Sequence, residues 1–377
     1  MPLTGVESWL EEQERFDALR QRALAKGGAR LADLAYANAW DGPPEAVREA
    51  LRKAAASEGA LDLQYTPYGG QTVARRVAAR ELAEVTGVPF GFRDVLLTAG
   101  AMAALSLLLR MSLPGRVLIP TPTWLDHPLY AAMQRHEPVL VPLADDFSLD
   151  VDALRDALAT TEELRAVILT CPGNPTGHVF REAELRALAA ALEDAGRPLL
   201  ISDECHRDYL FGGTPFLSPA AFYANTAVVY SYGKRFLVQG QRLGYAALHP
   251  DAPEAGARKV LLKRLARAGG YGMPTSLMQR ALPDLVKIDP ARAAIEARRE
   301  RTREALEALG LRVVGEATMF LYVEVGDDWA VTEALADRGV LVLPGAIFHH
   351  RGWLRLTCSA TDAMLARGVE ALAEVLA

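Results

Sequence analysis

The sequence is poor in cysteine, in net positive charge and in long apolar runs. Its 377 residues include three cysteines, Cys171, Cys205 and Cys358, and their wide spacing predicts neither a disulfide framework nor a cysteine-rich zinc site. A net charge of -6 disfavours a nucleic-acid-binding surface, and no apolar stretch approaches the length of a membrane span. We therefore expect neither nucleic acid nor membrane as a partner.

The first residues also lack the features of a secretory signal peptide. Acidic side chains occupy MPLTGVESWLEEQERF, where a signal peptide would have basic residues followed by an apolar segment. The apolar fraction of 50% is sufficient for a large core. These features predict a globular cytoplasmic protein with reduced cysteines.

Short apolar runs alternate with helical patterns from Val95 to His249, and they predict the main sheet. Near-continuous apolar strands that alternate with helices are typical of an α/β fold, with a mostly parallel seven-stranded sheet flanked by helices. The seven candidate strands lie in VLLTAG, RVLIPTPTW, EPVLVPL, RAVILTCPGNPTG, RPLLISDECH, TAVVYSYGK and RLGYAALHP.

Outside this region the patterns predict a smaller α+β part. We expect helices over residues 8–26, 45–57, 73–84, 252–268 and 292–309, with Pro283 and Pro290 interrupting the chain upstream of the last of these. Short strands, with one helix among them, are expected over residues 311–314, 319–325, 340–343 and 353–357. The predicted division is a large α/β domain over 45–285 and a small α+β domain over 1–44 and 286–377.

Polar residues follow several of the predicted strands, where open α/β sheets bind their ligands. Lys234 comes just after an apolar strand, with Ser231 before it and Arg242 after it. An amine between a hydroxyl and a guanidinium suits a ligand with a carbonyl and a phosphate. The same residues taken alone could equally be an ordinary loop lysine and a surface arginine.

Two further strand ends carry polar residues that suit the same kind of ligand. A carboxylate at a buried strand end, such as Asp203, costs several kcal/mol unless a cation meets it, and a protonated pyridine nitrogen is such a cation. Asn174 lies in Cys171-Pro-Gly-Asn-Pro-Thr-Gly177, where prolines and glycines restrict the backbone and the amide can donate to a ligand oxygen.

Other strand ends are less specific. Ala101 and Met102 begin a helix whose N-terminal N–H groups would favour an anion, although small residues there also serve packing. Trp124 could stack on a planar ring or cover the core.

Taken in chain order, these motifs resemble the fold-type I pyridoxal phosphate enzymes of the class I/II aminotransferase family. The order is Y-x-P-x-G, a small-residue turn, an aromatic residue, N-P-T-G, S-D-E, S-x-x-K and G-x-R-x-G-Y, and the resemblance runs from about Leu31 to the C-terminus. It implies pyridoxal 5′-phosphate as cofactor, an L-amino acid and a 2-oxo acid as substrates, and a homodimer with shared active sites.

The resemblance also implies residue roles. Lys234 would form an aldimine with the cofactor and then serve as the base at Cα, and Asp203 would pair with the pyridine nitrogen. Arg355 would bind the substrate α-carboxylate, with Asn174 and Ala37 also at the substrate. The implied cofactor contacts are Ala101, Met102, Trp124, Asn174, Asp203, His206, Ser231, Lys234, Arg242 and, from the neighbouring subunit, Tyr65.

Some positions depart from the family pattern. His206 stands where aminotransferases usually have tyrosine, in a D-E-x-H-x-D run that looks more like the related C–S β-lyases, and Ala37 aligns with a frequent glycine. β-Elimination, replacement or cyclisation therefore remains the alternative reaction. A ligand-sensing regulator is disfavoured, because about thirty residues before the resemblance are too few for a DNA-binding domain. His349 and His350 lack ligands at zinc spacing, so no metal site is expected.

Overall fold

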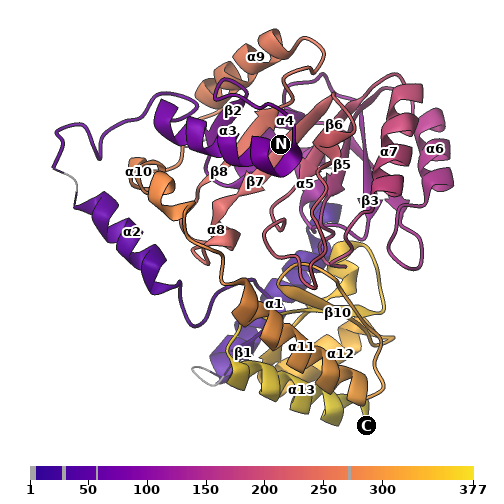
Figure 1. Cartoon of the computed structure of the whole chain (residues 1–377). Helices are drawn as coiled ribbons and strands as arrows, with labels where there is room; N and C mark the ends of the chain where they lie inside the picture. The colour runs from indigo at the N-terminus through magenta and orange to yellow at the C-terminus, as the bar shows by residue number, and fades with distance from the viewer. Residues whose placement is uncertain (1–5, 28–30, 57, 271–272) are drawn as a thin grey trace.

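A seven-stranded sheet forms the centre of the computed structural model, which describes residues 6–27, 31–56, 58–270 and 273–377 (Figure 1). Its strand order is β2-β8-β7-β6-β5-β3-β4; β8 runs antiparallel to both of its neighbours, and the other pairs are parallel. This arrangement confirms the predicted α/β fold. The strands are β2 (Val95–Thr98), β3 (Arg116–Thr121), β4 (Glu137–Pro142), β5 (Leu164–Thr170), β6 (Leu199–Asp203), β7 (Thr226–Ser231) and β8 (Gly244–Leu248).

Helices cover both faces of this sheet because its strands are apolar on both sides. In β5, for example, Val167 packs in the cluster that includes α6 and α7, whereas Ile168 packs in the cluster that includes α4, α5 and α9. Helices α3 and α10 pack against the β2–β8 end of the sheet. Within the described ranges, no helix has the length and apolar character needed to cross a membrane. The bounds are α3 (Thr72–Thr86), α4 (Ala101–Leu109), α5 (His127–Met133), α6 (Val151–Thr160), α7 (Glu182–Asp194), α9 (Ala255–Ala268) and α10 (Ser276–Leu285).

The C-terminal part of the chain forms a second, antiparallel sheet in the order β12-β13-β10-β9. The N-terminal segment joins this part, because β1 pairs with β11 in parallel and α1 packs beside α12. Figure 1 shows α1, α11, α12 and α13 grouped in the lower part of the view, with α9 at the top. The strands are β1 (Ala32–Asp33), β9 (Val313–Val314), β10 (Phe320–Glu324), β11 (Val340–Leu341), β12 (Leu343–Pro344) and β13 (Trp353–Thr357). The remaining helices are η1 (Glu7–Trp9), α1 (Glu11–Gly27), α2 (Glu45–Ala55), η3 (Pro219–Ala221), α8 (Tyr232–Arg235), α11 (Arg292–Ala308), α12 (Asp328–Asp337), η4 (Gly345–Phe348) and α13 (Asp362–Leu376).

Two helices differ from the sequence-based expectation. Pro283 was expected to interrupt the chain but lies inside α10, in its last turn, and the buried Leu282 and Leu285 pack the helix against the core. The C-terminal helix α13 was not predicted. Thr361 caps it by accepting a hydrogen bond from the Met364 N–H, and its buried face packs on the second sheet.

The parallel strands end at one edge of the large sheet, and this edge positions the site. Thr170 at the end of β5 is in register with Asp203 at the end of β6, and Asp203 is in register with Val229 of β7. The residues that follow β3, β5, β6 and β7 therefore meet above the middle of the sheet.

Candidate active site

Asp203, the last residue of β6, lies buried at the centre of this edge. Its Oδ1 accepts a hydrogen bond from the Cys205 N–H at 3.1 Å, and its Oδ2 lies 3.2 Å from His127 Nε2. Burial raises the pKa of Asp203, but the hydrogen bond and charge of His127, the Cys205 side chain and the nearby Lys234 charge together hold that pKa well below its usual value. The carboxylate is therefore ionised.

Lys234 lies on α8, the single helical turn that follows β7. The Tyr209 hydroxyl donates to the Lys234 main-chain carbonyl at 3.0 Å. Within the described part of the chain, Lys234 Nζ has no hydrogen-bond or ion-pair partner, although its charge acts on both Asp203 and His206. The amine thus lies near the ionised carboxylate without being paired to it.

His206 is buried next to these two residues. Its ring packs edge-on against Phe320, with 5.2 Å between the ring centroids, and its Nδ1 has no hydrogen-bond partner among the described residues. Burial lowers the pKa of His206 well below its usual range, the Lys234 and Arg355 charges lower it further, and Asp203 opposes them only partly. His206 is therefore a neutral imidazole near neutral pH.

Arg355 of β13 and Asn174 form a second group at the site. Arg355 Nη1 donates to Asn174 Oδ1 at 3.0 Å and Nη2 donates to the Ala35 carbonyl at 2.8 Å, while the guanidinium lies 3.9 Å from the centroid of the Phe320 ring. Its Nε has no partner in the described structure, and burial lowers the pKa of Arg355 to about 9. Ala37 packs in the same apolar cluster as Phe320, so the structure brings Arg355, Asn174 and Ala37 together.

The start of α4 forms a third group with the residues that flank Lys234. Gly100, with φ of 81°, precedes Ala101 and Met102, and a Cβ on it would lie 2.4 Å from Arg242 Nη2. A Cβ on Gly244, which pairs with Ser231, would lie 2.9 Å from Gly100 Cα. The positive φ of Gly100 favours glycine there, and Gly244 must be glycine because its neighbours are main-chain atoms. These close approaches bring the Arg242 guanidinium and the end of β7 against the first turn of α4.

Tyr65, one of the predicted cofactor contacts, lies outside these three groups. Tyr65 is fully exposed, with a relative accessibility of 103%, in the loop between α2 and α3. Leu61 and Leu63, in the same loop, are 80% and 52% exposed. A side chain so exposed is available to a second molecule and not to the site of its own chain.

Comparison with known proteins identifies the family. The family model for aminotransferase class I and II matches residues 31–372. The chain belongs to this family. It is 28% identical over 353 residues to a probable aspartate/prephenate aminotransferase of Aquifex aeolicus, with 88% of each chain covered. It is also 33% identical to a histidinol-phosphate aminotransferase of Symbiobacterium thermophilum, with 86% of each covered.

Solved structures show the same relationship. A Thermus thermophilus aspartate aminotransferase variant aligns with a TM-score of 0.84 at 27% identity over 96% of both chains. The protein is an enzyme that transfers amino groups, and the alternative of elimination, replacement or cyclisation is not favoured by these relatives.

The aminotransferase site contains residues that the sequence did not single out. His127 is fully buried, and its Nδ1 lies 2.8 Å from Thr123 Oγ1, which in turn lies 3.2 Å from Thr170 Oγ1. The same loop holds Trp124, whose ring packs edge-on against His127 at 5.3 Å. The spacing Trp-x-x-His after a predicted strand is the signal that could have indicated this histidine.

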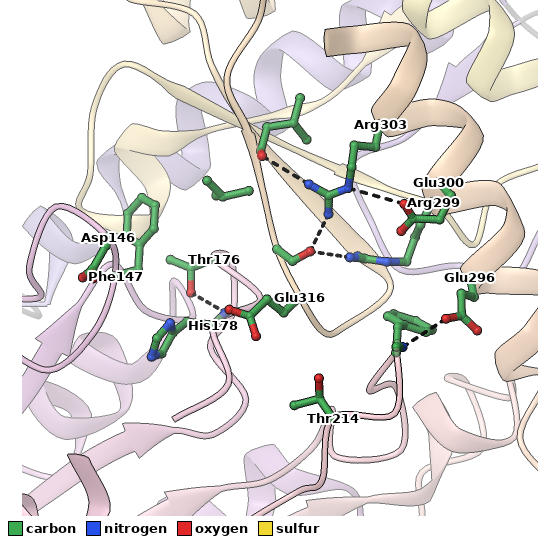
Figure 2. A pocket seen from close by; sticks show the side chains of 15 residues that line it. Asp146, Phe147, Thr176, His178, Thr214, Glu296, Arg299, Glu300, Arg303 and Glu316 are labelled. Carbon is green, nitrogen blue, oxygen red and sulfur yellow. Dashed lines mark hydrogen bonds and ion pairs between the residues drawn. The ribbon is translucent and has the colours of Figure 1, made fainter. Parts of the chain in front are cut away.

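A cavity of about 600 Å³ is lined by none of the predicted site residues, although Thr176 in its wall lies two residues after Asn174 (Figure 2). Thr176 and His178 line one side, and Arg299 and Arg303 of α11 line the other. The two guanidiniums donate to the main-chain carbonyl of Gly315, and Arg299 also to Thr318. The two arginines therefore hold the backbone that borders the cavity.

Replacing the aminotransferase's His206 with asparagine is expected to reduce the loss of stability in acid. The unfolded chain binds a proton at this histidine below about pH 6.5, whereas the folded protein keeps it neutral, so folding stability falls as the pH drops below that value. In urea titrations of the apoprotein, the variant's free energy of unfolding should fall less steeply with decreasing pH, by up to about 1.4 kcal/mol per unit. Identical slopes for both proteins between pH 6.5 and 5 would contradict a neutral His206.

Proposed function

We propose that this aminotransferase binds pyridoxal 5′-phosphate on Lys234 and transfers the amino group of an L-amino acid to a 2-oxo acid. The observation that carries the proposal is the ionised, buried Asp203 next to an amine with no described partner. When bound, pyridoxal phosphate supplies a protonated ring that withdraws electrons from the substrate's Cα. Asp203 would face the ring nitrogen, and His127 keeps its carboxylate oriented and ionised.

The remaining polar groups fit the rest of this cofactor. Because Asn174 Oδ1 already accepts from Arg355, its NH₂ is left to donate to a ligand oxygen, and His206 has a buried ring nitrogen with no described partner. Trp124 would stack on the ring. Ser231, Arg242 and the first N–H groups of α4 at Ala101 and Met102 would hold the phosphate.

Arg355 and Lys234 would act on the substrate itself. The Arg355 guanidinium is already fixed by Asn174 and the Ala35 carbonyl, so it can receive the α-carboxylate without first being ordered. A carboxylate would also compensate the burial that now lowers its pKa. Lys234 Nζ, as the neutral amine left when the substrate's amino group takes its place, would take the proton from Cα and hold it for return, because it lies beside Asp203 and has no described partner.

A second copy of the chain would complete the site. Tyr65 and the exposed apolar side chains of its loop support a homodimer in which each Tyr65 reaches the phosphate of the other subunit. We also propose the large domain as residues 45–285 and the small one as 1–44 with 286–377. The three cysteines are buried and unpaired, which supports a cytoplasmic location.

The proposal is tested by a half-reaction with a panel of L-amino acids. We expect the absorbance of the lysine-bound cofactor to disappear as its amine form appears, with one 2-oxo acid released per site. Release of pyruvate and ammonia without the amine form would favour elimination. No change with any amino acid would count against the proposed function.

A further inference from the structure

The buried carboxylate of Glu81, on α3, holds the short helix that carries Lys234 from both sides. Glu81 Oε2 accepts a hydrogen bond from the Tyr232 hydroxyl at 2.7 Å, and Oε1 accepts one from Arg235 Nη1 at 2.7 Å. Tyr232 lies two residues before Lys234, and Arg235 follows it directly. One side chain from a distant helix therefore fixes both ends of α8.

Arg235 also reaches two other segments. Its Nη1 lies 3.5 Å from Asp208 Oδ1, and its Nη2 donates to the Val286 carbonyl, just after α10, at 3.2 Å. The other Asp208 oxygen accepts from the Tyr230 hydroxyl of β7. Asp208 lies in the same run as Asp203, so Arg235 connects the Lys234 turn to the segment that carries the ring-facing carboxylate.

These contacts are better explained by positioning than by stability. A buried ion pair is weak evidence for stability, because desolvation offsets much of its attraction. A helix of four residues is also too short to hold its own shape, so its orientation must come from its anchors. Those anchors converge on the residues either side of Lys234, and Tyr209 holds the Lys234 carbonyl itself.

We propose that Glu81 and Arg235 are positioning residues that fix the direction of the Lys234 amine at the substrate. The inference rests on the proposed role of Lys234. A small displacement of a reacting group is costly, so Arg235→Ala should lower kcat about 10- to 100-fold. KM should change little, because Arg355 and Asn174 are untouched. Arg235→Lys keeps a cation for Glu81 and Asp208 and should recover most of the rate.

The test combines kcat and KM with two other measurements on the same variants. The apoprotein is mixed with pyridoxal phosphate, and the rate of covalent attachment at Lys234 is followed by borohydride trapping; this rate should fall in Arg235→Ala and recover in Arg235→Lys. Melting temperature is measured in parallel. Glu81→Gln keeps a hydrogen-bonding group for Tyr232 but removes the charge facing Arg235. If Arg235→Ala does not fold, the same measurements on Glu81→Gln test whether the ion pair positions Lys234.

A matched control separates positioning from loss of an ion pair. Lys259 pairs with Asp94 at similar burial, with side-chain exposures of 22% and 11% against 16% and 11% for Arg235 and Glu81. Lys259→Met should lower the melting temperature without changing kcat or the attachment rate. If Arg235→Ala kept the wild-type kcat and the wild-type attachment rate, the inference would be overturned, even if the melting temperature of the variant were lower. If the wild-type enzyme never converted the cofactor to its amine form, the proposed function would be wrong. The attachment rates would still show whether Glu81 and Arg235 position Lys234.

Discussion

Replacing Lys234 with alanine is expected to lower kcat for amino-group transfer by about 10⁴-fold. The change removes both the proposed covalent attachment point and the only described amine at the site, and general-base catalysis by a positioned side chain contributes about 10²- to 10⁴-fold by itself. The measurement is a single-turnover half-reaction with the best amino acid of the panel, followed by the appearance of the 2-oxo acid.

Lys263 provides the control for this experiment. It is exposed on α9 and makes no ion pair within the described ranges, so Lys263→Ala should retain the full rate. A Lys234→Ala enzyme with a rate within tenfold of wild type would show that another group serves as the base and would contradict the assignment of Lys234.

Replacing Asp203 with asparagine is expected to lower kcat/KM by about 10²- to 10³-fold. The amide has nearly the same shape but no charge, so it cannot keep a ring nitrogen protonated, and removing one preorganised electrostatic contact typically has this effect. The comparison uses steady-state kinetics at pH 7.5, with binding of pyridoxal phosphate to the apoprotein measured separately.

His127→Asn gives a graded comparison for Asp203. His127 acts through Asp203, so its loss should reduce kcat/KM less than the loss of the carboxylate itself. If both variants transferred amino groups as fast as wild type while binding the cofactor normally, the ring-facing role of Asp203 would be wrong.

The sequence predicted the large sheet well because its strands are buried on both faces and read as unbroken apolar runs. Val167 and Ile168 show why: they are neighbours in β5, yet each meets a layer of helices. Pro283 misled the prediction at α10, because the burial of Leu282 and Leu285 offsets the helical hydrogen bond that a proline cannot donate. The C-terminal helix α13 was missed, although both its cap at Thr361 and its apolar face can be read from the local sequence.

The site was less accessible to sequence reasoning than the fold. Asp203 ends a strand, and Asn174 and Lys234 lie in the short segments that follow strands, so all three can be found by position alone. Glu81 and Arg235 are 154 residues apart, so nothing local indicates that they meet. His206 differs again: its position was noticed, but only its burial beside Lys234 and Phe320 shows that it is held neutral.

The pairing of β1 with β11 constrains the order in which the chain can fold during synthesis. Ala32 is made long before its partner Val340, so the two can pair only after the residues between them have been synthesised. The strands of the large sheet, by contrast, all lie between Val95 and Leu248 and can pair earlier. Apolar residues near β1, such as Leu34 and Phe16, therefore stay exposed to solvent until the C-terminal residues that cover them have been made. Truncation at the C-terminus should thus expose the N-terminus as well.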